Sequence, residues 1–523
     1  MTRPRSRIVS GSLFLSLLLL SSSLFAQDLP SRGGGRQVQT LASHSGSSPF
    51  TPPDTDDTLF VVDTGSGLDT GCTSRSGGPL QINIPVKRNV GVLDGFGHVA
   101  DPVGMAARGL ISPFAKLIIP AFDIDVHGAP GFPPEVDRVE FNGHNLGNLT
   151  GDNNIWKLNE FPIRIEWINF PQPSMGGPTQ DEPTGAEPVP AQNTVTIYID
   201  QASAPAENWC MAVDWAQLEF KAIAPIFLVH GIAAQADTWN TSFRTYFDNA
   251  KLPYSSNISL NANGSVAENS QLLAARIASL VRAFGAKKYH IVAHSKGGLD
   301  TRLFTNTQYN PQTAKLLSVS TLSTPHHGSV LADIVHAART TNDPQSTDAD
   351  IQKIISTELL PFFSFPPQPP GILDLQTARA ASFNQNQPLR GDIKWWGWGA
   401  DADANGNGTI DVPAETAGMI PTSLPNGFVS KVTNATYRVL ANVETVKITT
   451  VTQLWGLNEY TAIEKGTTYG FQVGNDLAVT TLSAFPPPGG SFMGAFQANH
   501  TTIRSDNAAQ SILIQINNQF PNN

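Results

Sequence analysis

The sequence predicts an all-β sandwich followed by an α/β domain with a mostly parallel sheet, and two observations lead to this prediction. The patterning changes near residue 222: short alternating runs broken by Gly, Pro and Asn give way to strands that alternate with helical patterns. The length of 523 residues also exceeds what one hydrophobic core usually organises. We therefore expect two domains, over residues 58–222 and 223–523.

The first 26 residues have the layout of a secretory signal. Three arginines precede an apolar run over residues 13–20, and small residues follow as far as Ala26. The run is shorter than the about 20 residues that a membrane span needs, and no later segment approaches that length. We expect cleavage near Ala26, a secreted protein (extracellular or periplasmic) and no transmembrane segment. Residues 27–57, rich in Ser, Gly, Pro and Thr, are expected to form a disordered linker.

The net charge bears on which partners the chain can bind, and the cysteines bear on whether it forms a disulfide. The formal net charge is −10, which disfavours nucleic acid as a partner. The two cysteines are Cys72 and Cys210, and an exported protein meets conditions in which such a pair oxidises. We expect one disulfide between them. The alternative is two buried thiols.

Residues 58–222 carry the signals of an antiparallel β-sandwich. Apolar and polar residues alternate over 80–84 and 194–199, a hairpin is indicated at Asn142-Gly143, and 209–218 has the pattern of a closing strand. The combination resembles jelly-roll modules of the galactose-binding-like kind that accompany secreted enzymes. We expect a structural or surface-docking role, with carbohydrate binding as the less favoured alternative.

Residues 223–523 follow the order strand, loop, helix, strand. Residues 225–229 and 289–293 are compact apolar strands, and Ser265 and Glu268 form a capping box that opens a helix. The apolar face of that helix comprises Leu272, Leu273, Ile277, Leu280, Val281 and Phe284. Such alternation predicts a parallel sheet with both faces covered and with function at the carboxyl ends of the strands.

Ser295 is the expected nucleophile, because it follows an apolar strand directly and precedes a plausible helix. The turn has the small-x-Ser-x-Gly form, with Ala293 at its first position and Gly297 at its last, and small residues suit a strained turn that presents the hydroxyl. Upstream, the tripeptide His-Gly-Ile ends at Ile232. The backbone N–H groups of Ile232 and Lys296 are the expected oxyanion-hole donors. The alternative is an ordinary strand-to-helix turn.

These motifs together resemble those of secreted bacterial triacylglycerol lipases and related esterases of the α/β-hydrolase superfamily, over roughly residues 222–523. The segments that carry the resemblance are Val229-His230-Gly231, Ala293-His294-Ser295-Lys296-Gly297-Gly298, Ser323-Thr324-Pro325-His326-His327-Gly328-Ser329, Leu375-Gln376-Thr377 and Ala381-Ser382-Phe383-Asn384.

The resemblance implies a catalytic acid and base near the C-terminus. Asp476 and His500 stand at the matching positions, and the chain order Ser, Asp, His is that of this superfamily. His500 would take the proton of Ser295 and Asp476 would hold the imidazole in the right tautomer. The family more often has Gly where this chain has Leu477.

A second chemistry is indicated by a loop at about residues 401–415 in which oxygen-bearing side chains alternate around glycines. This register resembles EF-hand and dockerin loops, although its twelfth position is Ala414, followed by Glu415. We expect structural Ca²⁺ there and no cofactor for catalysis; the alternative is a solvated Asx-rich turn. The expected ligands are Asp401, Asp403, Asn405, Asn407, Thr409 and Asp411.

Residues 329–376 stand where related hydrolases insert a lid or cap. They include an amphipathic stretch at 351–360 and an apolar run at 362–367, which would suit acyl chains. The leading functional hypothesis is carboxylic-ester hydrolysis of an ester or lipid substrate through an acyl-enzyme. The alternatives are a polyester depolymerase or amidase on the same scaffold, or a non-catalytic exported binding protein.

Overall fold

The structure is a computed structural model. It describes residues 48–53, 58–63, 73–86, 102–107, 111–128, 133–171, 189–202, 210–221, 223–239, 242–250, 252–284, 286–356, 369–419, 425–452 and 459–521. The expected signal segment, most of the expected linker and residues 357–368 of the expected lid lie outside these ranges. Cys72 and the side chain of Cys210 also lie outside them, so the disulfide stays a prediction.

Antiparallel sheets occupy the N-terminal part of the described chain. One sheet has the order β1-β10-β4-β9-β2, with β7 paired to β4, and the other has the order β3-β8-β5-β6. The strands are β1 Thr58–Asp63, β2 Thr73–Ser74, β3 Leu80–Val86, β4 Phe114–Phe122, β5 Arg138–Phe141, β6 His144–Asn148, β7 Trp156–Arg164, β8 Ala191–Tyr198, β9 Cys210–Val213 and β10 Trp215–Glu219. The short helices here are η1 Arg75–Gly77, α1 Pro102–Ala107 and η2 Ile165–Trp167.

Alternation along these strands produces the core between the two sheets. On β3, for example, Ile82, Ile84 and Val86 are buried while the residues between them are not. The hairpin expected at Asn142-Gly143 joins β5 to β6, and both residues have positive φ, 48° and 82°. The expected closing strand at 209–218 is two strands, β9 and β10, interrupted at Asp214. The galactose-binding-like topology stays a prediction.

A six-stranded sheet, in which every pairing is parallel, organises the C-terminal part. Its order is β12-β11-β13-β14-β16-β19. The strands are β11 Ile226–Val229, β12 Tyr254–Ser255, β13 Lys288–His294, β14 Lys315–Leu322, β16 Lys394–Asp401 and β19 Ser491–Gln497. The helices around it are η3 Ala236–Trp239, α2 Ser242–Ala250, α3 Val266–Phe284, α4 Gly297–Thr307, α8 Thr377–Asn386 and α10 Asp506–Gln519.

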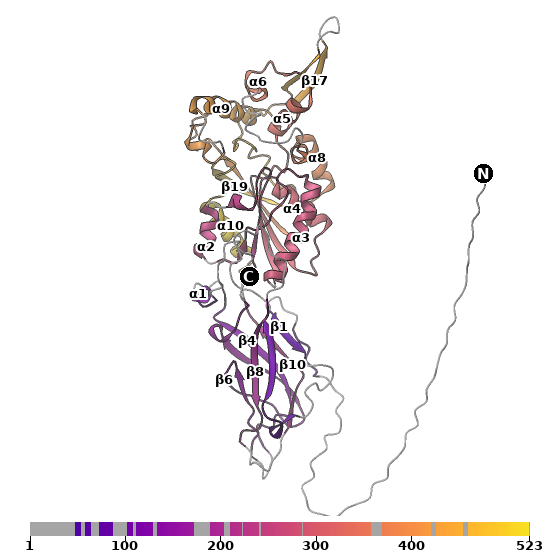
Figure 1. Cartoon of the computed structure of the whole chain (residues 1–523), viewed down its shortest axis with the longest axis vertical. Helices are drawn as coiled ribbons and strands as arrows, with labels where there is room; N and C mark the ends of the chain where they lie inside the picture. The colour runs from indigo at the N-terminus through magenta and orange to yellow at the C-terminus, as the bar shows by residue number, and fades with distance from the viewer. Residues whose placement is uncertain are drawn as a thin grey trace, which may run out of the picture. The chain divides into compact units, whose positions relative to one another are not determined.

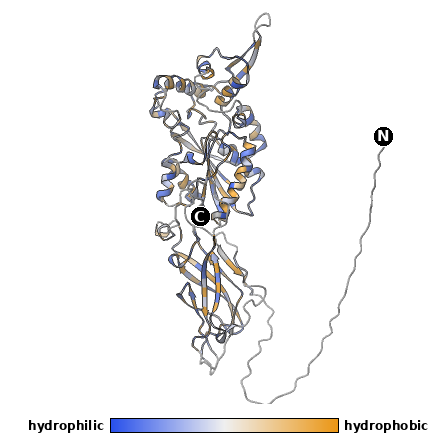
Figure 2. Ribbon diagram, viewed as in Figure 1, coloured by the Kyte–Doolittle hydropathy of each residue, from blue (hydrophilic) through white to orange (hydrophobic). Residues whose placement is uncertain are grey.

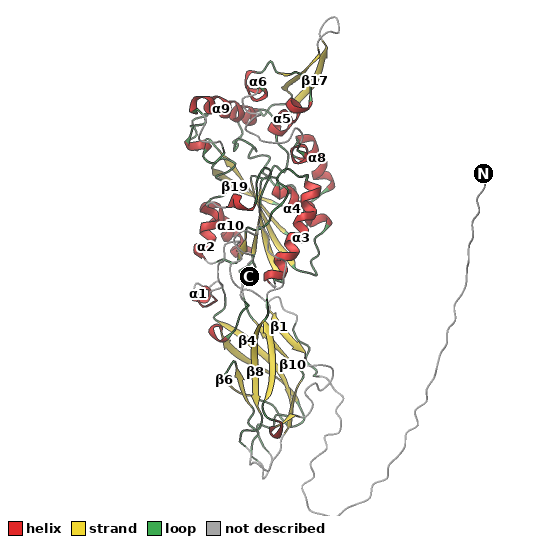
Figure 3. Ribbon diagram, in the orientation of Figure 1, coloured by secondary structure: helices red, strands yellow, loops and turns green. Residues whose placement is uncertain are grey.

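Both faces of this sheet are covered, as expected. Residues of β11 alternate between two hydrophobic clusters: Phe227 and Val229 pack with α3, whereas Ile226 and Leu228 pack with α2 and α10. Figure 1 shows α3 and α4 on one side of the sheet and α2 and α10 on the other. The layering of strands between helices is clear in Figure 3, and the surrounding helices carry mixed hydrophilic and hydrophobic segments in Figure 2.

Helix α3 begins as the capping box predicts, with one difference. The backbone N–H of Glu268 donates to Ser265 Oγ at 3.1 Å, but the Glu268 carboxylate accepts from Asn261 Nδ2 instead of returning to Ser265. The expected apolar face is buried except for Leu272, which is 37% exposed. That assignment was wrong because Leu272 lies one helical step outside the stripe formed by Leu273, Ile277 and Leu280.

A group of helices and a hairpin lies beyond the carboxyl ends of the strands. Helices α5 and α6 share a hydrophobic cluster with α9, and β18 contributes Ile463 to it. The segment 329–376, for which a lid or cap is expected, contributes α5 and α6 to this group, whereas α9 and the hairpin come from later residues. The elements are α5 Val330–Thr340, β15 Pro344–Gln345, α6 Ala349–Ile355, α7 Pro370–Asp374, η4 Ala414–Thr416, α9 Asn426–Asn442, β17 Val446–Thr452 and β18 Glu459–Lys465.

None of the helices in the described ranges is long and apolar enough to cross a membrane.

Candidate active site

Ser295 occupies a strained turn between β13 and α4. Its φ is 55°, a left-handed conformation that non-glycine residues rarely adopt, and its side chain is 4% exposed. Gly297 is required by crowding, because a Cβ there would lie 2.4 Å from the carbonyl oxygen of His230. The sequence signal of small residues around the serine therefore has a direct steric cause.

The loop after β11 passes against this turn. A Cβ on Gly231 would lie 2.6 Å from the Cβ of Ser295, so only glycine allows the approach. Burial lowers the pKa of His230, and its ring is fixed by two neighbours: Nδ1 lies 2.9 Å from the carbonyl oxygen of Gly231, and Leu260 N donates to Nε2 at 2.9 Å. The side chain of His230 therefore holds the loop in place.

The two expected oxyanion donors border Ser295 without a competing partner. Among the described residues, no backbone acceptor bonds to the N–H of Ile232 or of Lys296. The Lys296 side chain is occupied elsewhere: its Nζ lies 2.7 Å from Asp300 Oδ1, and both side chains are 1% exposed. Burial is the largest effect on Asp300 and raises its pKa to about 6. This ion pair sits in the first turn of α4, directly behind the turn that holds Ser295.

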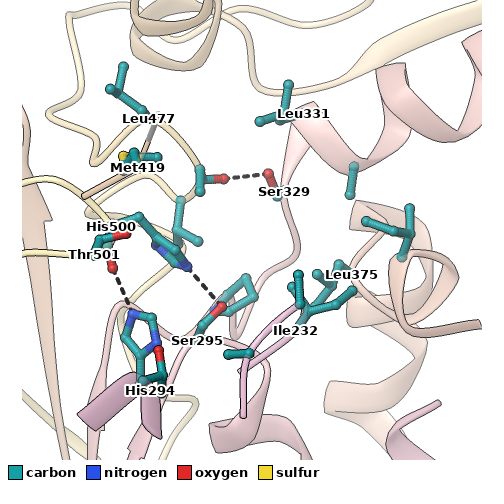
Figure 4. A pocket seen from close by; sticks show the side chains of 18 of the residues that line it. Ile232, His294, Ser295, Ser329, Leu331, Leu375, Met419, Leu477, His500 and Thr501 are labelled. Carbon is teal, nitrogen blue, oxygen red and sulfur yellow. Dashed lines mark hydrogen bonds between the residues drawn. The ribbon is translucent and has the colours of Figure 1, made fainter. Parts of the chain in front are cut away.

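The structure brings Ser295, His500 and Asp476 together in one hydrogen-bonded series. His500 Nε2 lies 2.9 Å from Ser295 Oγ, and His500 Nδ1 lies 2.8 Å from Asp476 Oδ2. The fully buried carboxylate of Asp476 also accepts from the backbone N–H groups of Ala478 and Val479 at 3.0 and 2.7 Å. Figure 4 shows the imidazole of His500 directed at the hydroxyl of Ser295.

Two residues to which the sequence assigned no role, His294 and Asn499, hold the segment that carries His500. His294 Nε2 lies 2.7 Å from the carbonyl oxygen of His500, and because burial keeps the pKa of His294 well below its ordinary value, the neutral ring donates this bond. Asn499 Nδ2 donates at 3.0 Å to the carbonyl oxygens of both Glu415 and Ala417. His500 is thus fixed from the β13 side and from the loop at 401–415.

The other histidines of the resemblance motifs do not join this series. His326 is fully buried, and its Nε2 lies 3.3 Å from Thr321 Oγ1. His327 donates its backbone N–H to Ser483 Oγ at 3.3 Å. Their role within the described structure is to fix the loop after β14.

A cavity of about 650 Å³ opens beside Ser295. Figure 4 shows Ile232, Leu331 and Leu375 on one side of the serine, and Met419 and Leu477 on the side of His500. Most of the lining is apolar, which suits a hydrocarbon chain. The polar and charged lining residues are Gln235, Thr238, Asn263, His294, Ser295, Ser329, Thr433, Thr436, His500, Thr501 and Arg504.

Leu477 stands where the resemblance predicts glycine, and its position in this wall accounts for the leucine. Its φ is 74°, where glycine is favoured, yet its side chain is 4% exposed and lines the cavity. It also packs against Ala402, Ile410 and Tyr437. The chain retains a strained backbone here and gains a buried apolar wall.

The loop at 401–415 adopts part of the arrangement expected of a calcium loop. Asp403 accepts from the N–H groups of Asn407 and Gly408 at 3.0 and 2.6 Å, and Asn407 Oδ1 accepts from Thr409 N at 2.8 Å. The Glu415 carboxylate accepts from the N–H groups of residues 404 and 411 at 2.8 and 2.7 Å. It therefore closes the loop one position later than in an EF-hand.

Other features of this loop fit a cation less well. The carboxylate of Asp401 accepts from Tyr437 at 3.0 Å, and Asn405 Nδ2 donates to Asp411 Oδ2 at 2.7 Å. Among the described residues, no three His, Cys, Asp or Glu side chains converge closely enough to hold a metal. A cation here would rely on amide and carbonyl oxygens beside Asp403, Asp411 and Glu415.

Similarity to known proteins agrees with the expected resemblance. The chain is 29% identical over 180 residues to a triacylglycerol lipase of Pseudarthrobacter phenanthrenivorans, covering 32% of this chain and 54% of that protein. It is also 29% identical over 180 residues to a triacylglycerol lipase of Burkholderia plantarii, covering 32% of this chain and 49% of that protein. The chain thus spans about half the length of the curated relatives it matches, and no family model matches it.

Solved structures of bacterial lipases also align with the chain. The mature form of Bacillus licheniformis lipase BlEst2 aligns with a TM-score of 0.38 and 20% identity, over 56% of this chain and 91% of that one. Lipase 1 from Pelosinus fermentans aligns with a TM-score of 0.36 and 14% identity, over 55% of this chain and 98% of that one. The resemblance to bacterial lipases and esterases predicted from the motifs is confirmed by the curated relatives.

Proposed function

We propose that this protein is an exported carboxylic-ester hydrolase of the lipase or esterase kind, with Ser295 as its nucleophile. The observation that carries the proposal is the series in which His500 lies 2.9 Å from Ser295 Oγ and 2.8 Å from Asp476. The names of the curated relatives, and the largely apolar cavity beside the serine, support an ester or lipid substrate. Export rests on the signal-like pattern of residues 1–26.

Acylation follows from this arrangement. Ser295 Oγ attacks the carbonyl carbon of the ester while His500 Nε2 accepts the hydroxyl proton. Negative charge then develops on the carbonyl oxygen, where the N–H groups of Ile232 and Lys296 would bind it. Each such donor contributes about 3 kcal/mol to the transition state. The tetrahedral intermediate collapses, the C–O bond of the alcohol breaks, and His500 returns the proton to the departing oxygen.

Deacylation repeats these steps with water. His500 takes a proton from water, the resulting hydroxide attacks the acyl carbon, and Ser295 leaves with the proton returned by His500. Asp476 directs Nδ1 of His500 and stabilises the imidazolium that forms in each half-reaction. The bonds from His294 and Asn499 keep the loop of His500 in register with Ser295 throughout.

Replacement of the nucleophile tests the proposal. Ser295→Ala is expected to reduce p-nitrophenyl butyrate turnover by at least about 10⁴-fold, since the nucleophile and the base act as a unit. The thermal melt should stay close to that of the wild type, because the change removes one oxygen. Asp476→Asn is expected to lower kcat by about 10⁴-fold through the wrong imidazole tautomer. Turnover by Ser295→Ala near the wild-type level would contradict the assignment.

A substrate panel separates the alternatives. Soluble short-chain esters, emulsified triacylglycerols, a polyester film and matched amides distinguish esterase, lipase, depolymerase and amidase, because a triad alone does not choose between leaving groups. A non-catalytic exported binding protein would turn over none of them. For the antiparallel domain at 58–222 we propose a structural or surface-docking role.

We also propose that the loop at 401–415 binds structural Ca²⁺. Support comes from the EF-hand-like register around Asp403 and from Glu415, which lies where a closing acidic ligand is needed. Bound calcium would supply a central charge that holds the loop together. The carbonyl oxygens of Glu415, at the end of this loop, and of Ala417, just after it, accept from Asn499 Nδ2, so order in the loop would support the position of His500.

A further inference from the structure

Arg504 is a charged residue in the wall of the cavity, and it has no role in the ester-hydrolysis mechanism. It lies four positions after His500 and is 5% exposed. Among the described residues that line this cavity it is the single Lys, Arg, Asp or Glu. The cavity is otherwise lined by apolar side chains, neutral amides, hydroxyls and histidines.

The guanidinium of Arg504 bonds to neutral acceptors and retains a free donor. Nη1 donates to the carbonyl oxygen and the hydroxyl of Thr238, and Nε donates to the carbonyl oxygen of Thr501 at 3.2 Å. Within the described part of the chain, no carboxylate forms an ion pair with Arg504, and its hydrogen bonds run from Nε and Nη1, with none from Nη2. The neutral bonds hold the guanidinium in one orientation and leave its charge uncompensated.

A guanidinium in a cavity wall is a favourable partner for an anion that enters the cavity. Burial of a charge without an ion partner is unfavourable, so pairing with an anion would offset that cost. Burial lowers the pKa of Arg504 to about 10, so the group stays positively charged at neutral pH. The planar guanidinium is the side chain best suited to bind carboxylate or phosphate in a desolvated site.

Another buried arginine shows the contrast. Arg302 is fully buried, and burial lowers its pKa to about 10 as well. Its three nitrogens all have acceptors: Nε donates to Gln387 O at 2.5 Å, Nη1 to Asn384 Oδ1 at 2.6 Å, and Nη2 to Asn384 O at 3.5 Å. Arg302 does not line the cavity. All three guanidinium nitrogens of Arg302 thus bond within the fold, whereas Arg504 lines the cavity and has one nitrogen without an acceptor among the described residues.

We propose that Arg504 binds an anionic group, a carboxylate or a phosphate, carried by the substrate beside the scissile ester. This inference rests on the proposed function, because it names the substrate class of the same site. The apolar wall at Leu331 and Leu375 would hold a hydrocarbon segment, and Arg504 would hold the charged end. Substrates of this class include monoesters of dicarboxylic acids and acylated glycerol phosphates.

Paired esters test the proposal. Monoethyl adipate is compared with ethyl hexanoate for the carboxylate, and 1-butyrylglycerol 3-phosphate with 1-monobutyrin for the phosphate, with proton release followed in a pH-stat. The readout is the ratio of kcat/KM for the anionic ester to that for its neutral partner. A charged hydrogen bond contributes enough for Arg504→Gln to lower this ratio by roughly 10- to 100-fold in at least one arm, mainly through KM.

Controls separate recognition from folding. Arg504→Lys keeps the charge and is expected to retain part of the ratio. Arg302→Gln removes an equally buried arginine outside the cavity, so it is expected to lower the melting temperature while leaving the ratio unchanged. A ratio in Arg504→Gln equal to that of the wild type in both arms, or an equal loss on charged and neutral esters, would overturn the proposal and leave Arg504 with a bracing role.

Failure of the proposed function gives a different result. If the wild type hydrolyses none of the four esters, the hydrolase assignment fails, and binding of adipate and glycerol 3-phosphate is measured by calorimetry instead. Binding to the wild type that is lost in Arg504→Gln and kept in Arg302→Gln supports an anion site at Arg504. Absence of binding of both anions to the wild type overturns it.

Discussion

At the scale of single residues, two positions with unusual backbone conformation belong to the site. Ser295 and Leu477 both have positive φ, at 55° and 74°, and both line the cavity. Strain of this kind costs about 1 to 3 kcal/mol and persists only where the surroundings enforce it. For Ser295 the surroundings are the close approaches of Gly231 and Gly297, and for Leu477 they are the bonds of the neighbouring Asp476.

At position 477 a glycine variant should be more stable than an alanine variant, which is the reverse of the usual order. Leu477→Ala loses a buried side chain, which costs about 2 to 5 kcal/mol, and keeps the strained conformation. Leu477→Gly loses the same burial but relieves about 1 to 2 kcal/mol of left-handed strain, partly offset by chain entropy. We therefore expect both variants to be less stable than the wild type, with the glycine variant melting above the alanine variant.

The two Leu477 variants also test whether this side chain limits the size of the substrate. Because Leu477 forms part of its wall, both variants should raise kcat/KM for bulkier esters relative to p-nitrophenyl acetate. An ester panel across acyl lengths checks this. An alanine variant that melts above the glycine variant would show that the backbone at 477 is not strained.

At the scale of elements, the loop at 401–415 connects the proposed calcium site to His500. Its end bonds to Asn499, and the backbone of Asp401 accepts from Ala498 N at 2.8 Å. Order in this loop therefore supports the segment that carries His500. Loss of order in the loop would weaken the hydrogen bonds that hold the segment of His500.

Chelation tests this element. If Ca²⁺ binds, transfer from 1 mM CaCl₂ to EGTA should lower the melting temperature, since a ligand at 100 times its Kd contributes about 2.7 kcal/mol. Asp403→Ala with Asp411→Ala should abolish the sensitivity. Asp401 is also an expected ligand, but its carboxylate accepts from Tyr437, so Asp401→Ala is expected to keep the sensitivity. Equal melts of the wild type in calcium and in EGTA would contradict the proposed site.

At the scale of the whole molecule, buried acids make stability depend on pH. Burial, followed by the charge of Asp137, raises the pKa of Glu135 to about 9, and Asp123 and Asp200 add to the shift. Burial also raises the pKa of Asp137 to about 6. Among the described cations, Arg75 is the one that pairs with these four acids, and its Nη1 lies 3.6 Å from Asp200 Oδ2. The folded antiparallel domain therefore holds protons that the unfolded chain would release.

The sign of the effect follows from linkage. A carboxyl group whose pKa is raised by folding contributes stability that is complete below its ordinary pKa and is lost as the pH rises through the raised value. The free energy of unfolding of the antiparallel domain should thus fall between about pH 5 and pH 9. Glu135→Gln, which keeps the shape without the charge, should flatten this decline in denaturant titrations.

An exposed acid provides the control for this prediction. Glu160 lies on β7 of the same domain and its side chain is 49% exposed, so Glu160→Gln should leave the pH dependence as it is in the wild type. A decline of equal slope in Glu135→Gln would show that the buried acids do not hold extra protons.

Local patterns were sufficient to predict the elements that build the site. The strands β11 and β13, the start of α3 and the turn at Ser295 all follow from contiguous residues, because periodicity and steric need act within a few positions. The glycines around Ser295 were also readable, since the chain is crowded there. Leu272 shows the limit of such patterns, because a leucine at the edge of a helical stripe is buried or exposed according to what packs beside it.

Contacts between distant segments were decided only by the tertiary structure. The bond from His294 to His500 spans 206 residues, and that from Arg504 to Thr238 spans 266. The apolar wall formed by Leu477 and the cap contribution of α9 likewise depend on which segments meet. Residues 295, 476 and 500 could be named from the sequence by resemblance. The supports of His500 and the unpaired charge of Arg504 could not, because no local pattern records which loops converge at the carboxyl ends of parallel strands.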